Sequence, residues 1–106
     1  MRYNKLVRDR VPELIQADGR RVIIKHLNQA EKFENARLKL YEELKEYEDA
    51  NIDEECLEEL VDILELAYAL GKMHGASFEE MESIRAKKRE QKGGFEKGYF
   101  LEIVLG

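Results

Sequence analysis

The chain has 106 residues, a length typical of one domain, and a formal net charge of -5. No apolar run approaches the roughly 18 residues that a membrane-spanning helix needs, and the single cysteine, Cys56, excludes an internal disulfide. We therefore expect one soluble domain over residues 1–106 in a reducing cytoplasm, without a membrane partner.

Charge is distributed unevenly along the chain. Residues 1–25 carry a net charge of +4, residues 31–66 carry -10, and residues 85–98 carry +4. The acidic centre argues against nucleic acid as a partner, because a duplex binder needs a basic face. Two interpretations stay open: the three regions neutralise one another within the fold, or they hold a metal through carboxylates and phosphate through cations.

Helix start and stop signals predict two helices in the first half of the chain. The first is short and runs from about Asp9, its expected N-cap, to Ala17, where an Asp-Gly pair follows. The second begins at a capping box formed by Asn28 and Glu31 and reaches about Asp49.

The same signals predict two further helices and two strands. The third helix starts at Asp53, its expected N-cap, and ends near His74. The fourth starts at a capping box of Ser77 and Glu80 and ends near Gln91, before two glycines. The β-branched segment near 21–25 and a closing segment near 99–105 predict a two-stranded ribbon beside the helices. The expected fold class is mainly α, a helical bundle with this small ribbon.

The third helix is apolar around most of its circumference, which is typical of a central helix. At ~100° per residue, Glu58, Glu65 and Lys72 gather in one narrow polar sector. Glu59 and Asp62 lie instead within the apolar arc. Ionised carboxylates in such a place need a counter-charge or a metal, since their burial otherwise costs several kcal/mol.

The second helix offers partners for this pair, because Glu43 and Glu46 lie along the edge of its apolar stripe. An antiparallel hairpin would bring them opposite Glu59 and Asp62. Four convergent carboxylates suit a hard cation, Mg²⁺ first and Mn²⁺ second. The alternative is that all four are surface groups paired with the basic ends of the chain. No histidine follows a glutamate by three residues, so the di-iron bundle motif is absent.

Residues 42–46 and 59–62, Glu-Glu-Leu-Lys-Glu and Glu-Leu-Val-Asp, resemble the E-E-x-x-E…E-x-x-D pattern of the all-α NTP pyrophosphatases. That superfamily includes MazG-like proteins, phosphoribosyl-ATP pyrophosphohydrolases and dimeric dUTPases. The segments Tyr3–Asp9 and Lys88–Phe95 resemble a subgroup of single-domain phosphoribosyl-ATP pyrophosphohydrolase-like, MazG-like proteins. Lys92 stands where an arginine often precedes Gly-Gly-Phe, which keeps the charge and loses the bidentate fork.

The resemblance implies a MazG-type bundle that cleaves a ribo- or deoxynucleoside triphosphate between its α- and β-phosphates, and clearing the nucleotide pool is one role open to such an enzyme. It implies that Mg²⁺, held by Glu43, Glu46, Glu59 and Asp62, contacts phosphate oxygens and activates a water. Glu46 would orient or deprotonate that water. The residues expected to neutralise or bind the phosphates are Lys5, Arg8, Lys39, Lys88 and Lys92. A homodimer or a dimer of dimers is expected from the same resemblance.

Two other functions remain open at this point. In the first, the substrate is phosphoribosyl-ATP rather than a free nucleotide. In the second, the chain is a non-catalytic helical binding module that keeps its acidic hairpin for a basic partner or a regulatory metal. Replacing Glu59 by glutamine separates these classes, because an enzyme loses turnover whereas a binding module keeps its partner.

Overall fold

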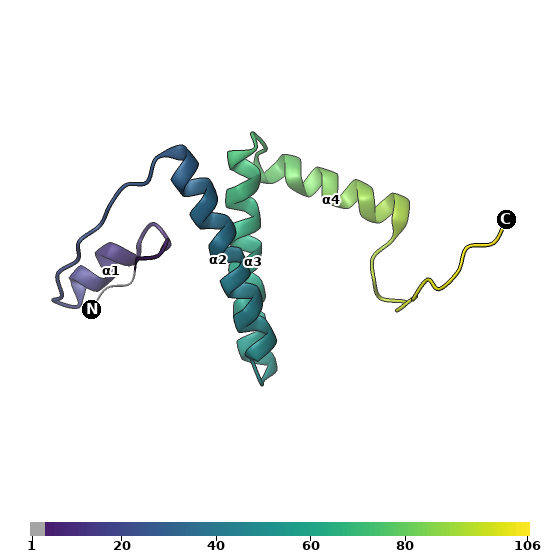
Figure 1. Ribbon diagram of the computed structural model, residues 1–106, viewed down its shortest axis with the longest axis horizontal. Coiled ribbons are helices and arrows are strands. Elements are labelled where there is room, and N and C mark those ends of the chain that lie inside the picture. Colours follow the sequence, from purple (N-terminus) through teal and green to yellow (C-terminus); the bar gives the residue numbers. More distant parts are fainter. Residues whose placement is uncertain (1–3) are drawn as a thin grey trace.

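The computed structural model describes residues 4–106, and within that range the chain is helical and contains no β-strand (Figure 1). The prediction of a mainly helical chain is confirmed. Tyr3, part of the N-terminal resemblance, lies outside the described residues. The helices are α1 (Val11–Ala17), α2 (Gln29–Asp49), α3 (Asp53–Met73) and α4 (Phe78–Lys92).

Both predicted capping boxes are present and fix the starts of α2 and α4. The Asn28 side chain accepts a hydrogen bond from the Glu31 amide at 2.8 Å, and the Glu31 carboxylate accepts one from the Asn28 amide at 3.1 Å. Ser77 and Glu80 repeat the arrangement at 3.1 and 3.3 Å. Each box satisfies two amides that the first helical turn leaves without a partner.

The N-caps expected at Asp9 and Asp53 are wrong. α1 begins only at Val11, because a turn in which the Val11 amide donates to the Arg8 carbonyl at 3.0 Å precedes it. α3 already includes Asp53, and the capping position belongs to Ile52, which makes no side-chain capping bond. As a first-turn acid, Asp53 interacts favourably with the positive end of the helix dipole instead of accepting a capping hydrogen bond.

Helices α2 and α3 form an antiparallel hairpin, the arrangement on which the expected convergence of carboxylates depended, and they pack along much of their length (Figure 1). α4 packs on α3 only near the junction between them. There the rings of Tyr68 and Phe78 meet edge to face, with centroids 4.6 Å apart. Gly71 lies directly against the Met81 side chain, so no larger residue fits without displacing it. Beyond this junction α4 leads away from the hairpin.

The predicted two-stranded ribbon is not formed in this structure. Residues 21–25 precede α2 on one side of the hairpin, whereas residues 99–105 follow α4 on the other side (Figure 1). The divergence of α4 carries the C-terminal segment away from its expected partner. Strand propensity alone does not create a strand, because an extended segment needs a neighbour to satisfy its backbone groups.

The chain is far more extended than a compact domain of its size. Its radius of gyration is 18.1 Å, against about 13 Å for a compact chain of this length. Its accessible surface is 10,056 Å², against about 6,200 Å² from the usual scaling with mass. Among the described hydrophobic residues only Ala36 is fully buried. None of the helices within residues 4–106 has the length and apolar composition needed to cross a bilayer.

Candidate metal centre

Three of the four predicted carboxylates converge in the hairpin. Glu43 and Glu46 project from α2, and Glu59 projects from α3. One oxygen of each lies within 4.8 Å of the corresponding oxygens of the other two. Two ligands on opposite sides of a cation with 2.1 Å bonds are about 4.2 Å apart, so small rotations of these side chains suffice to close on Mg²⁺.

Two oxygen atoms of this carboxylate cluster are buried without a hydrogen-bond partner, Oε2 of Glu43 and Oε2 of Glu59. Glu43 is only 7% exposed, which is unusual for a glutamate. A buried carboxylate oxygen without a donor costs free energy that a bound cation would recover. The donor set is also entirely oxygen, the chemistry that Mg²⁺ and Mn²⁺ prefer. The residues therefore fit a hard divalent cation.

Crowding of the carboxylates makes Glu59 a weaker acid than an isolated glutamate. The neighbouring Glu43 carboxyl, then burial, then the Glu46 carboxyl raise the pKa of Glu59 to about 7 from its ordinary value of 4.5. Like charges in close proximity disfavour simultaneous ionisation, so one carboxyl retains its proton until another positive charge arrives. A divalent cation is the group that would release that proton.

Lys39 lies one turn before Glu43 on α2 and is the only cation with an ion pair to the cluster among the described residues. Its Nζ is 3.6 Å from Oε1 of Glu43, and its side chain is 19% exposed. The separation is long for a direct hydrogen bond, so the contact is mainly electrostatic. Lys39 offsets part of the negative charge of Glu43 and leaves Oε2 free for another partner.

Asp62, the fourth predicted ligand, is not part of the converging group. Its Oδ1 accepts a hydrogen bond from the Arg8 guanidinium at 2.5 Å instead. Both side chains are partly exposed, and Arg8 comes from the segment that precedes α1. Asp62 nevertheless lies one turn after Glu59 on α3, so it borders the cluster. Two residues predicted for different roles, a metal ligand and a phosphate ligand, thus neutralise each other.

The other predicted phosphate ligands are not gathered at the cluster within one chain. Lys88 and Lys92 lie on the outer part of α4, which leads away from the hairpin (Figure 1). They line a hollow with Arg85, Arg89 and the turn at residues 93–96. Lys5 lies in the exposed segment before α1. The single chain therefore brings together the carboxylates and Lys39 but not the C-terminal lysines.

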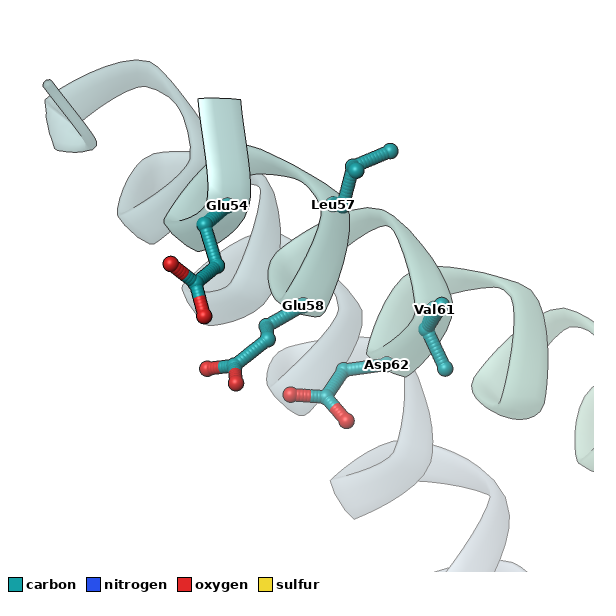
Figure 2. A pocket seen from close by; sticks show the side chains of 5 residues that line it. All are labelled: Glu54, Leu57, Glu58, Val61 and Asp62. Atoms are coloured by element: carbon teal, nitrogen blue, oxygen red, sulfur yellow. The ribbon is translucent and has the colours of Figure 1, made fainter. Parts of the chain in front are cut away.

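A second acidic feature lies on α3 and extends beyond the predicted site residues. Glu54, Glu58 and Asp62 point to the same side of the helix and line a hollow together with Leu57 and Val61 (Figure 2). Their spacing of four residues was the available signal, since such residues form a row along a helix.

No protein-family model, curated protein or solved structure matches this chain.

Proposed function

We propose that the protein is a Mg²⁺-dependent nucleotide pyrophosphohydrolase that cleaves a nucleoside triphosphate between its α- and β-phosphates. The observation that carries the proposal is the convergence of Glu43, Glu46 and Glu59 from two helices, with two buried carboxylate oxygens that have no donor. A solvated helix face would leave such groups in water. This placement instead favours a site built to receive a divalent cation.

Mg²⁺ bound by these carboxylates would supply positive charge for the phosphate oxygens and make a water molecule more acidic. Glu43 and Glu59 hold their buried oxygens at the centre of the cluster. Glu46 is exposed and lies at its solvent edge, where it can orient the attacking water and accept its proton. Lys39, already close to Glu43, is placed to offset negative charge that enters with the substrate.

The choice of reaction and substrate class rests on the resemblance of residues 42–46 and 59–62 to the all-α NTP pyrophosphatases. We propose from the same resemblance that the helices form a MazG-type bundle. We also propose that Asp62 becomes a fourth metal ligand once Arg8 is displaced from it. Arg8 is then free to contact the polyphosphate. Exchange of the Arg8–Asp62 pair for metal and phosphate gives each side chain a new partner of opposite charge, because the metal is a cation and the polyphosphate an anion.

The test is release of pyrophosphate and nucleoside monophosphate from a panel of ribo- and deoxynucleoside triphosphates and phosphoribosyl-ATP, with Mg²⁺, with Mn²⁺ and with chelator. We expect metal-dependent release of both products from triphosphates. Glu59→Gln should abolish it, whereas Glu65→Gln, an exposed acid on the same helix, should not. Turnover of phosphoribosyl-ATP alone would reassign the substrate. Folded protein that binds Mg²⁺ and cleaves none of these compounds would refute the enzymatic proposal.

A further inference from the structure

The outer part of α4 forms a basic row that ends beside an exposed aromatic side chain. Arg85, Lys88, Arg89 and Lys92 line one hollow, and Phe95 at its end is 98% exposed. Arg85 pairs with Glu82, and Arg89 pairs with Glu96. Lys88 and Lys92 have no ion-pair partner in the part of the chain that the structure describes. The basic row therefore keeps two uncompensated positive charges.

The first half of α3 carries the complementary acidic row, Glu54, Glu58 and Asp62 (Figure 2). Asp62 is paired with Arg8, whereas Glu54 and Glu58 have no ion-pair partner within residues 4–106. Leu57 and Val61 flank the row and are 62% and 58% exposed. An exposed apolar border around charged groups is typical of a surface that binds another protein surface.

The two rows match in length as well as in sign. The acidic row spans residues 54–62 and the basic row residues 85–92, which at 1.5 Å per residue are about 12 and 10 Å long. Within one chain they cannot meet. α4 joins α3 at its C-terminal end, through Tyr68–Phe78 and Gly71–Met81, while the acidic row lies at the opposite end of α3.

The exposed area is large enough to accommodate a partner of substantial size. The accessible surface exceeds that of a compact chain of this mass by about 3,900 Å². Obligate homodimer interfaces bury about 2,000–5,000 Å² in total, half of it on each copy. A second copy that covers α3 and α4 would therefore bury about a quarter to two thirds of this excess on each chain, and the remainder leaves room for a dimer of dimers.

We propose that the basic row of α4 in a second copy of this chain docks on the acidic row of α3 and completes the carboxylate site. A two-fold axis makes the contact twice, since each copy offers one row of each sign. Asp62 belongs to the acidic row and lies one turn from Glu59, so docking brings Lys88 and Lys92 of the second copy to the border of the cluster. The role of these lysines in substrate binding rests on the proposed function, whereas the interface does not.

Charge reversal tests the interface by its effect on the mass of the protein in solution. Glu54→Lys/Glu58→Lys makes both rows basic, and Lys88→Glu/Lys92→Glu makes both acidic. Each variant alone brings like charges together and should lose the wild-type assembly in analytical ultracentrifugation. A mixture of the two restores opposite charges at both contacts and should recover the wild-type mass. Recovery of the wild-type mass on mixing supports the proposed interface even if each variant alone loses helicity.

A matched control reverses two exposed acids outside the rows, Glu34→Lys and Glu90→Lys. Glu34 is nine positions before Glu43, about two and a half helical turns, so it lies on the opposite side of α2. Glu90 lies on α4 away from the basic row. The control should keep the wild-type mass. A monomeric wild-type protein, row variants that remain assembled, or a mixture that fails to assemble would each overturn the proposed interface.

Sharing of the site is tested by complementation between two inactive chains. One carries Glu59→Gln, and the other carries Lys88→Ala and Lys92→Ala. In a heterodimer one site then has both defects and the other has none. A statistical mixture after co-refolding should regain roughly one quarter of wild-type turnover. Activity no higher than that of the parents would overturn the shared site. A wild-type protein without turnover would refute only the proposed function, since the mass experiment still decides the interface.

Discussion

Charged side chains are distributed differently in the α2–α3 hairpin and in the C-terminal arm. The arm comprises α4 and residues 93–106. The hairpin draws Glu43, Glu46 and Glu59 together and buries one oxygen each of Glu43 and Glu59, so that acidic groups are concentrated where the helices pack. The arm spreads its basic groups over an exposed surface next to an apolar tail. Under the two proposals above, the hairpin needs a cation and the arm needs an acidic, partly apolar surface.

The largest expected effect distinguishes metal binding by the hairpin from substrate binding by the arm. Glu43→Gln removes the most buried carboxylate of the cluster and should weaken Mg²⁺ binding at least about 100-fold, since even the groups that orient metal ligands are worth 10- to 100-fold. Lys92→Ala should leave Mg²⁺ affinity unchanged and raise KM for the nucleotide. Isothermal titration with Mg²⁺ and steady-state kinetics measure the two quantities.

Equal losses of Mg²⁺ affinity in both variants would contradict this division of roles. Glu42→Gln is the control for Glu43→Gln, because Glu42 is the preceding residue on α2 and is exposed. It should bind Mg²⁺ as the wild-type protein does.

The second prediction concerns pH. Without metal, the folded pKa of Glu59 is about 7 and its ordinary value is 4.5, so the folded state binds this proton more tightly than the unfolded state. The stabilisation from Glu59 is complete below about pH 4.5 and is lost as the pH rises to about 7. The thermal midpoint in chelator should therefore fall across this window. Mg²⁺ should reverse the trend, because it binds the deprotonated carboxylates.

Glu59→Gln should flatten the fall of the midpoint in chelator, since glutamine does not titrate. Scans at one protein concentration are required, because assembly makes the midpoint depend on concentration. A wild-type midpoint that stays constant across the window in chelator would show that the carboxylates do not interact in the folded state.

The contrast between hairpin and arm also explains which features the sequence could predict. The helix starts at Asn28 and Ser77 depend on side chains three residues apart, so local pattern is sufficient. The convergence of Glu43 and Glu59 needed only helical periodicity and one short turn. These features are fixed by contacts between residues close in sequence, and the structure contains them.

The features that the sequence misplaced depend on residues distant in the chain. The ribbon required residues 21–25 and 99–105 to meet, and the direction of α4 separates them. Asp62 pairs with Arg8, which is 54 positions away, and no local pattern relates the two. The acidic row on α3 was visible as a spacing, but the surface that we propose for its partner lies on a second copy of the chain.

The third prediction compares the two capping boxes. Asn28→Ala and Ser77→Ala each remove one side-chain cap, typically worth about 1 kcal/mol. The loss at Asn28 should appear in the free energy of global unfolding, because α2 packs along α3. The loss at Ser77 should appear as faster amide exchange in α4, whose outer part has little packing to protect it. Ser83→Ala, within α4, removes a hydroxyl without removing a cap and serves as control.

The smallest expected effect tests the pair that links the N-terminal segment to the hairpin. Arg8→Ala frees Asp62 from a partly exposed ion pair, and such pairs are worth about 0–1 kcal/mol. Mg²⁺ affinity should therefore rise, by up to about fivefold, while KM for the nucleotide increases if Arg8 contacts phosphate. Arg10→Ala removes the comparable Arg10–Glu13 pair and should change neither quantity. A loss of Mg²⁺ affinity in Arg8→Ala would show that Arg8 orients Asp62 for the metal instead of competing with it.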